Sequence, residues 1–147
     1  FVLITNTKGV KFFNLLKKKT NFEKDERIKF VGTVYNQELL KKIREEAFAY
    51  FHGHEVGGTN PSLIEALSST KLNFLLDVGF NKEVAQNGAL YWSKEPGSLS
   101  HLIDEVEYNR DKFEYLSTIA RKNVKMYFSW ELIVHTYEQI FANPGER

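Results

Sequence analysis

The sequence predicts an α/β fold in which a parallel β-sheet carries helices on both faces. Short apolar runs with strand character alternate with segments whose apolar residues recur at helical spacing. The run from Lys71 to Val78 is almost continuously apolar, as is typical of a parallel strand buried on both faces. Asn60 and Pro61 stand between a strand-like run and a helical one, and this pair typically begins a helix.

The composition is that of an ordinary globular domain. The chain has 147 residues, of which 42% are hydrophobic and 27% charged, enough for one domain with a real core. Its net charge of +1 argues against a broad basic surface for nucleic acid. Cysteine is absent, which excludes disulfides and thiolate metal sites and fits a cytoplasmic protein. No apolar run approaches the roughly 18 residues of a membrane span, and no signal peptide is evident.

The first third of the chain is expected to form two strands and two helices. The strands are Phe1–Thr5, expected to be buried, and Ile28–Val31. Between them lies a helix that ends at Lys17–Lys19, where cations favour the helix dipole. Asn36 can cap the second helix, Gln37–Ala47. Because the chain starts within strand-like residues, we expect it to be a piece of a larger protein.

After residue 70 the alternation continues and then gives way to helices. A short helical stretch begins at Glu83 and ends near Asn87-Gly88, a turn dipeptide, and Ala89–Trp92 is another short strand. Three helices follow, and their apolar residues are interpreted as core. These residues are Leu99, Leu102, Ile103 and Val106; then Phe113, Leu116, Ile119, Ala120 and Val124; and finally Trp130, Ile133, Val134, Tyr137, Ile140 and Phe141.

The stretch from Phe48 to Thr70 is the most informative part of the sequence. Phe48–His52 is read as a strand, Gly53–Thr59 as a glycine-bearing loop, and Asn60-Pro61 as the start of a helix. One face of that helix is apolar and is expected to pack on the sheet. Its residues are Leu63, Ala66, Leu67 and Thr70.

This arrangement has a chemical use. A helix N-terminus presents unpaired N–H groups and a partial positive charge, so it suits a phosphate. Gly57 and Gly58 lack a Cβ atom, so the backbone can approach a ligand closely. Glu65, one turn into the helix, can accept hydrogen bonds from two sugar hydroxyls. Together these features suggest a sugar nucleotide. The alternative is a capped helix after a flexible loop, with Glu65 merely solvated.

The fold class points to the same place. Ligands of parallel sheets bind outside the carboxyl ends of the strands. The strand ends at Gly32, at His52–His54 and at Val78–Gly79 are expected to share that edge. The motif therefore lies where a site is expected from the fold alone.

The segment also resembles the donor-binding motif of retaining family-4 glycosyltransferases of the GT-B fold. Pro61, Glu65, Ala66 and Leu67 match the end of that motif. The text HGHEVGGTNPSLIEAL is closer still to bacterial rhamnosyltransferases of capsule and exopolysaccharide assembly, and the likeness covers nearly the whole chain. The resemblance implies a Rossmann-like C-terminal half of a GT-B glycosyltransferase. In that fold the last helix often crosses back to the other domain, which implies that some aromatic residues of the last helix cover an interface with that domain. Residues 1–147 would be its nucleotide-sugar binding domain, truncated at the N-terminus and without the acceptor-binding domain.

The resemblance also implies roles for individual residues, although it identifies no catalytic residue. Glu65 would bind the ribose of the donor. The diphosphate and sugar would be held by Gly57, Gly58, Thr59, Asn60 and His54, and the base by Thr33, Val34 and Tyr35. The chain departs from the family at position 57, where Gly57 replaces a glutamate that contacts the donor sugar. Glu55 lies two residues away, and whether it takes over that contact is left open.

The function implied by the resemblance is retaining transfer of L-rhamnose from dTDP-rhamnose. The acceptor would be lipid-linked or a polysaccharide, reached through the missing domain at the inner face of the cell membrane. The fragment alone is expected to be inactive. No metal is implied, because the loop and helix end would stabilise the leaving diphosphate. His52 and His54 lie two apart in an extended segment, and no third metal ligand is evident near them.

Two alternatives remain open at this stage. A sugar-nucleotide 2-epimerase of the same fold would use the same nucleotide pocket. A non-catalytic Rossmann-like interaction domain would bind no ligand. A dinucleotide dehydrogenase is disfavoured, because Gly57-Gly58 lacks the Gly-x-Gly-x-x-Gly spacing.

Overall fold

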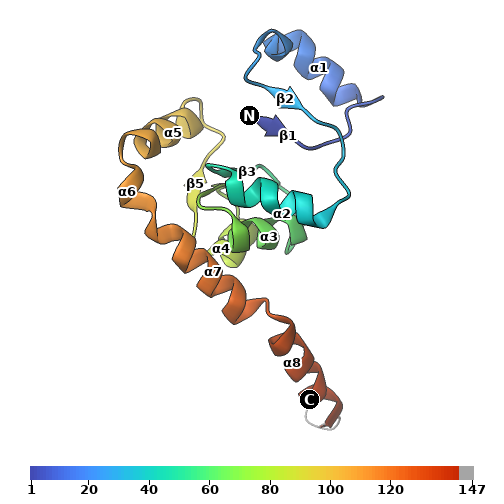
Figure 1. The fold of residues 1–147 in the computed structure, drawn as a ribbon, viewed down its shortest axis with the longest axis vertical. Coiled ribbons are helices and arrows are strands. Elements are labelled where there is room, and N and C mark those ends of the chain that lie inside the picture. The colour runs from blue at the N-terminus through green and yellow to red at the C-terminus, as the bar shows by residue number, and fades with distance from the viewer. Residues whose placement is uncertain (143–147) are drawn as a thin grey trace. The chain divides into compact units, whose positions relative to one another are not determined.

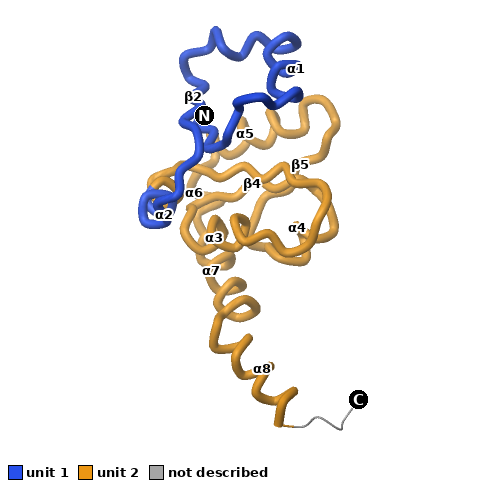
Figure 2. Tube along the Cα trace, turned by 90° about the vertical axis from the view of Figure 1, so that its right-hand side faces the viewer, with its two compact units in different colours: residues 1–42 blue, residues 43–147 orange. Residues whose placement is uncertain are grey.

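The computed structural model of the protein describes residues 1–142 and has the predicted α/β character (Figure 1). The chain divides into two compact units, residues 1–42 and residues 43–147 (Figure 2). Each unit carries its own parallel sheet, and each is described by itself below. No helix among the described residues is both long and apolar enough to cross a membrane.

The first unit is a small parallel pair of strands with one helix. β1 (Val2–Leu3) pairs with β2 (Lys29–Phe30), with Val2 opposite Lys29. Between them lie α1 (Lys11–Thr20) and the 3₁₀ helix η1 (Phe22–Lys24), so the predicted first helix is confirmed. Its core is aromatic, with ring centroids 5.0–5.7 Å apart among Phe13, Phe22 and Phe30.

The prediction of a buried strand over Phe1–Thr5 is wrong in its length and burial. The strand covers two residues, and Phe1 and Val2 are 65% and 59% exposed. The reason lies in the sheet of this unit, where β1 has β2 as its strand neighbour. A strand is buried on both faces only where a sheet continues around it and helices cover it.

α2 (Gln37–Glu46) crosses the boundary between the units, and its predicted cap is confirmed. The Asn36 side-chain oxygen accepts a hydrogen bond from the Leu39 N–H at 3.0 Å. This satisfies one of the donors that a helix leaves unpaired at its N-terminus.

The second unit is built on three parallel strands in the order β3-β4-β5. These are β3 (Tyr50–His52), β4 (Asn73–Leu76) and β5 (Leu90–Trp92). Phe51 lies opposite Phe74, and Leu75 lies opposite Tyr91. All four residues of the central strand β4 are buried, as predicted from its apolar run. β3 begins at Tyr50 rather than at Phe48, which is 43% exposed.

Helices cover both faces of this sheet, as the sequence predicts. One face packs against α3 (Pro61–Ser69), α4 (Gly79–Ala85) and α7 (Tyr115–Tyr127). Their shared core consists of Leu63, Leu67, Leu75, Val84, Ala85, Ala89 and Ala120. The other face packs against α5 (Ser98–Tyr108) and α6 (Arg110–Phe113), and Leu116 at the start of α7 also packs there. Its core consists of Leu72, Phe74, Val106, Phe113 and Leu116. Phe74 and Leu75 therefore face opposite layers, as successive residues of a strand must.

Two predicted helices have different bounds in the structure. α4 begins at Gly79 rather than at Glu83, so the residue expected to end the strand starts the helix. The predicted helix over residues 113–124 is two helices, α6 and α7, separated at Glu114. Phe113 packs in the core of one sheet face, and Ala120 packs in the core of the other. Leu116 of α7 joins the core of Phe113, so α7 by itself contributes to both cores, and these contacts do not explain the break at Glu114.

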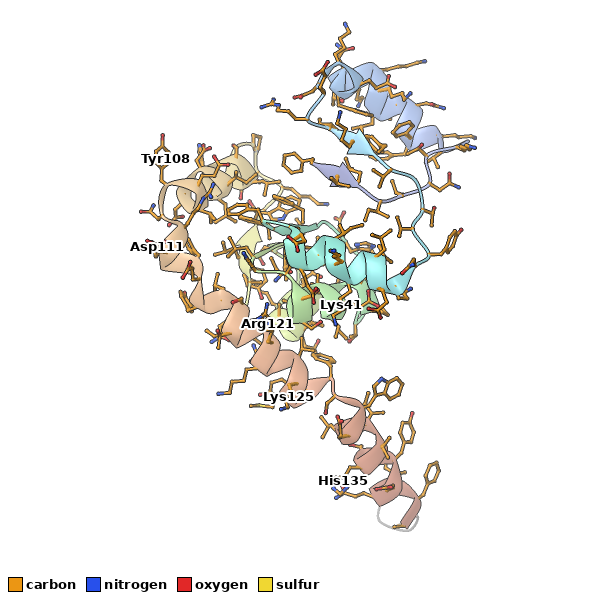
Figure 3. All side chains as sticks on the ribbon, in the orientation of Figure 1. Lys41, Tyr108, Asp111, Arg121, Lys125 and His135 are labelled. Carbon is orange, nitrogen blue, oxygen red and sulfur yellow. The ribbon has the colours of Figure 1, made fainter. Side chains whose placement is uncertain are left out.

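The prediction that the apolar residues of the last helix are core is wrong within the described residues. α8 (Trp130–Ala142) has no buried residue. Trp130 is 78% exposed and Phe141 75% exposed, and Figure 3 shows side chains standing out along this helix, with His135 labelled. Helical spacing predicts an apolar face correctly, but it does not predict what covers that face.

Candidate functional site

The candidate site lies at the carboxyl ends of β3 and β4, where the sequence places it. The loop of residues 53–60 leaves β3 there and leads into α3. Asn81, buried in α4, donates to the Leu76 carbonyl at 2.9 Å and to the His54 carbonyl at 3.3 Å. This amide ties the end of β4 to the start of the loop, so two of the three predicted strand ends do meet at one edge.

The middle of the loop is open around its backbone. Gly57 has a φ of +138°, a conformation that side chains with a Cβ rarely adopt, so glycine is needed there. Gly58 has an ordinary φ, and a Cβ built on it would have nothing within 4 Å. Val56 beside them is 87% exposed. A ligand can therefore approach this backbone closely.

The N-terminus of α3 differs from the expectation of unpaired N–H groups. The Asn60 side-chain oxygen accepts from the Ser62 N–H at 3.0 Å, which confirms the predicted cap. The Asn60 carbonyl accepts from the N–H groups of Leu63 at 3.0 Å and Ile64 at 3.2 Å. Pro61 has no N–H. The donors of the first turn are thus already used within the chain, and an anion would have to displace the cap or bind the loop backbone.

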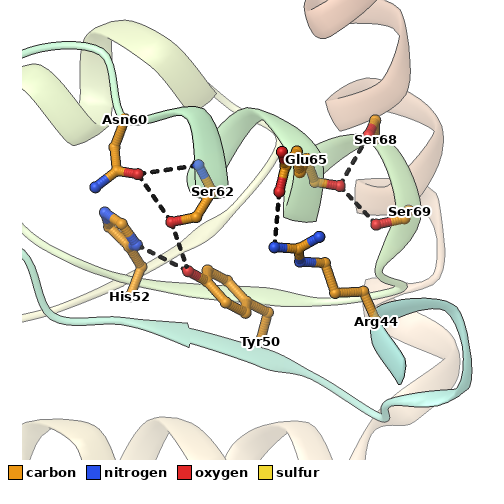
Figure 4. Close-up of polar contacts among 8 residues, drawn as sticks. All are labelled: Arg44, Tyr50, His52, Asn60, Ser62, Glu65, Ser68 and Ser69. Atoms are coloured by element: carbon orange, nitrogen blue, oxygen red, sulfur yellow. Dashed lines mark hydrogen bonds and ion pairs between the residues drawn. The ribbon is translucent and has the colours of Figure 1, made fainter. Parts of the chain in front are cut away.

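A line of polar side chains, with His52 buried and the others partly buried, supports this helix end (Figure 4). The Ser62 hydroxyl donates to the Asn60 side-chain oxygen at 2.8 Å. The Tyr50 hydroxyl lies 3.3 Å from Ser62 Oγ and 3.2 Å from His52 Nδ1. Strand β3 and helix α3 are therefore joined by hydrogen bonds at the edge of the sheet.

His52 is the most unusual titratable group of the site. It is 1% exposed, and its Nε2 has no hydrogen-bond partner among the described residues. Burial, and then the charge of His54, lower the pKa of His52 to about 4. The two imidazoles stack with centroids 4.5 Å apart, so they face the same way, as an extended segment requires.

The predicted contact of His54 with the donor stays a prediction. The two histidines do not form part of a metal cluster. Among the described residues there is no group of three or more histidine, cysteine, aspartate or glutamate side chains that could hold a metal ion.

Glu65, predicted to bind a ribose, is held by an ion pair. Its Oε2 lies 2.7 Å from a guanidinium nitrogen of Arg44, whose side chain is 14% exposed against 47% for Glu65 (Figure 4). The Glu65 carbonyl also accepts from the hydroxyls of Ser68 and Ser69. The carboxylate is therefore held in one orientation and is still half exposed, and a carboxylate has further lone pairs for hydroxyl donors.

Glu55, the nearest glutamate to Gly57, is also paired. Its Oε1 forms an ion pair with the ammonium of Lys94, which follows β5. Both side chains are more than half exposed. The pair joins the loop after β3 to the segment after β5 across the carboxyl edge.

Sequence reasoning missed several residues that the structure places at or beside this edge. Tyr50, Ser62, Arg44 and Lys94 hold the predicted site residues, as described above. Asp77 forms an ion pair with Lys82 at 2.6 Å. Burial, and then the charge of Asp77, raise the pKa of Tyr91 to about 12. Tyr50 and His52 are two residues apart in a strand, so their side chains lie on the same face. This spacing is the signal that could have indicated the hydrogen bond between them.

The residues predicted to hold the base belong to the first unit. Thr33, Val34 and Tyr35 follow β2 without regular structure, and Tyr35 is 86% exposed. Their role in base binding stays a prediction.

Comparison with known proteins identifies the fold. No protein-family profile matches the chain, and no curated protein matches it by sequence. Among solved structures it is similar to sucrose-phosphate synthase from Thermosynechococcus elongatus, with a TM-score of 0.74 and 18% identity. The likeness covers 96% of this chain but 38% of the synthase. The chain therefore has the fold found in a GT-B glycosyltransferase and spans well under half of that enzyme's length.

Proposed function

We propose that this chain is the nucleotide-sugar binding domain of a retaining GT-B glycosyltransferase whose acceptor-binding domain lies outside residues 1–147. The observation that carries the proposal is the open loop at residues 57 and 58, at the carboxyl edge of the sheet and directly before α3. The likeness of fold to a sucrose-phosphate synthase supports it. The proposed donor is dTDP-rhamnose, and the proposed acceptor is a lipid-linked sugar or a polysaccharide at the inner face of the cell membrane.

In this proposal the chain stabilises the departing diphosphate with backbone dipoles. The N–H groups of Gly57, Gly58 and Thr59 face the phosphates, and the partial positive charge of the α3 N-terminus adds to them. His54 lies at the start of the same loop and can donate to a phosphate or sugar oxygen. These contacts supply the charge stabilisation that a metal ion supplies in other enzymes, so the proposed reaction needs none.

In the same proposal Glu65 binds the ribose of the donor. The half-exposed Glu65 carboxylate accepts hydrogen bonds from the two ribose hydroxyls, and its ion pair with Arg44 fixes its orientation. Thr33, Val34 and Tyr35 contact the base.

A titration of dTDP and UDP into the chain, followed by amide NMR shifts, tests the proposal. Shifts should gather at residues 57–65 and 33–35 and be larger for dTDP. Gly58→Ala places a methyl group in open space and should weaken binding without loss of stability, since a Cβ there contacts no protein atom. Gly53→Ala is the matched control, because its Cβ would meet only Trp92 at an ordinary 3.8 Å.

Equal affinity of the Gly58→Ala chain and the parent would contradict close approach of the ligand to this backbone. Absence of shifts, in this chain and in the full-length protein, would favour a non-catalytic interaction domain. Product analysis with full-length protein, dTDP-rhamnose and acceptor separates transfer from 2-epimerisation. The fragment alone should show no turnover.

A further inference from the structure

The charged side chains of the protein are distributed unevenly between its two units. The net charge of +1 combines a basic first unit with an acidic second one (Figure 2). Residues 1–42 contain ten lysine and arginine residues against four aspartate and glutamate residues, a net charge of +6. Residues 43–147 contain ten basic and fifteen acidic residues, a net charge of −5. Such an asymmetry between two parts of a chain suggests that the basic part meets an anionic surface.

Within the first unit the positive charge is concentrated on α1 and on the turn before it. Residues 1–22 contain five lysines and no acidic residue. Among the described residues, Lys17 is the one lysine of α1 in an ion pair, with Glu23. The other three lysines of the helix are exposed and form no ion pair among the described residues: Lys11, Lys18 and Lys19. Their charges therefore face water without a neutralising partner in the described part of the chain.

The helix dipole explains only part of this pattern. Lys18 and Lys19 lie in the last turn of α1, where a cation is favoured. Lys11 is instead the first residue of the helix, Lys8 lies in the turn before it, and the first turn has no acidic residue. Cations at this end oppose the dipole. Lysines at both ends thus point to a ligand of the whole helix rather than to the stability of the helix itself.

Two apolar side chains are exposed among these lysines. Phe12 is 68% exposed and Leu15 49% exposed, whereas Phe13 packs on the rings of Phe22 and Phe30. Helical spacing places the two exposed side chains, together with the three exposed lysines, on the face of α1 that points away from this aromatic core. At 1.5 Å per residue, the ten residues of α1 present this outer face over about 15 Å. Lysines combined with exposed phenylalanine and leucine are typical of a helix that lies in the interface of a membrane.

We propose that the outer face of α1 docks on a membrane of anionic phospholipids. The lysines reach the headgroup phosphates, and Phe12 and Leu15 enter the boundary between headgroups and acyl chains. The phosphates of a nucleic acid attract lysines as well, but they offer no apolar region for these two side chains. The proposal goes beyond the proposed function, because none of its observations involves the loop at residues 53–60. Where both hold, α1 brings the enzyme to the membrane face that carries its acceptor.

Sedimentation with lipid vesicles tests the proposal. One set of vesicles contains phosphatidylcholine with one third phosphatidylglycerol, and the other contains phosphatidylcholine alone. The chain and the full-length protein should both bind the anionic vesicles about a hundredfold more tightly, since each lysine near an anionic surface strengthens binding about fivefold. Salt at about 0.5 M should remove most of this difference, because it screens exposed charges.

A triple variant and a matched control locate the charges that matter. The triple variant removes three charges from the outer face of α1 and should weaken binding to anionic vesicles by about a hundredfold. Its substitutions are Lys11→Gln, Lys18→Gln and Lys19→Gln. The control removes as many charges from exposed lysines of the second unit, among them Lys125, labelled in Figure 3, and should bind like the parent. Its substitutions are Lys71→Gln, Lys122→Gln and Lys125→Gln.

A double variant tests the apolar part of the face. Phe12→Gln with Leu15→Gln keeps every charge and should weaken binding to anionic vesicles by about tenfold, because two apolar side chains no longer leave water. All the substituted side chains are exposed, so the urea midpoints of the variants should stay close to that of the parent. The affinity of the triple variant for dTDP should also equal that of the parent, which separates a failure of membrane binding from a failure of the nucleotide site.

Several results would overturn the proposal. Equal binding of the parent to both kinds of vesicle would do so, as would an equal loss in the triple variant and its control. Parent-like vesicle binding by the double variant, with tighter binding of a single-stranded oligonucleotide through the same lysines, would make the face a nucleic-acid site instead. Vesicle binding by the chain but not by the full-length protein would mean that another part of the protein covers α1.

Discussion

Acid should destabilise this fold through His52, and the sign follows from the environment of the ring. The pKa of His52 falls from its ordinary 6.5 to about 4 in the folded chain, because burial and then His54 oppose the imidazolium. Between these two values the unfolded chain binds a proton that the folded chain does not. The free energy of unfolding therefore falls as the pH drops from about 6.5 towards 4. Above pH 6.5 His52 is neutral in both the folded and the unfolded chain, and its contribution to the free energy of unfolding is fully present.

The size of the effect follows from the same two pKa values. Each unit of pKa shift corresponds to about 1.4 kcal/mol, so the whole shift could contribute about 3 kcal/mol. Between pH 7 and pH 5 the linkage relation gives a loss of about 2 kcal/mol. Urea unfolding at several pH values over this range, followed by circular dichroism, measures it.

Other groups also titrate over this range, so the measured quantity is a difference between chains. His52→Gln offers an amide donor to Tyr50 and cannot titrate. The stability of the parent relative to His52→Gln should fall by about 2 kcal/mol from pH 7 to pH 5. A difference between parent and His52→Gln that does not change with pH would refute the reasoning.

Three further substitutions test the packing around the site by urea unfolding. Gly88→Ala should destabilise by about 2 kcal/mol or more, since its Cβ would lie 2.7 Å from the backbone of Ala120 in α7; an unchanged midpoint would contradict that packing. Asn60→Ala should cost about 1 kcal/mol through loss of the α3 cap, whereas Asn60→Ser should retain most of it. Phe74→Ala should lower the free energy of unfolding by roughly 3–5 kcal/mol, because this buried ring stacks on Phe51 with centroids 4.9 Å apart. A loss below 1 kcal/mol would argue against the core on that face of the sheet.

The parts of the fold that were predicted correctly are those decided by local sequence. The apolar run around Phe74 is typical of a strand that is covered on both faces, so the local sequence alone predicts its burial. The caps by Asn36 and Asn60 depend on hydrogen bonds within three residues, so they were readable as well. The carboxyl edge followed from the alternation of strands and helices.

The parts that were missed depend on contacts between distant residues. The break at Glu114 was missed because the helical spacing of the apolar residues continues across it, from Phe113 through Leu116 to Ala120. In the sequence, Arg44 is one of several charged residues of a helix, and only the folded structure shows its ion pair with Glu65. The exposure of α8 was missed for a related reason. The spacing of its apolar residues predicts an apolar face, but it does not predict which partner covers that face.

The occupied N-terminus of α3 changes how strongly this site can hold an anion. A helix end with free N–H groups gains the full strength of charge-assisted hydrogen bonds when a phosphate arrives. Here the Ser62 N–H and hydroxyl are already bonded to Asn60, so a phosphate gains only the difference between a charged and a neutral acceptor. In return, the donors are held in place before the ligand binds, and no side chain must be ordered at that moment. In the proposed function, this geometry favours a diphosphate that binds and leaves readily over one that is held tightly, which suits a site that releases its nucleotide in every turnover.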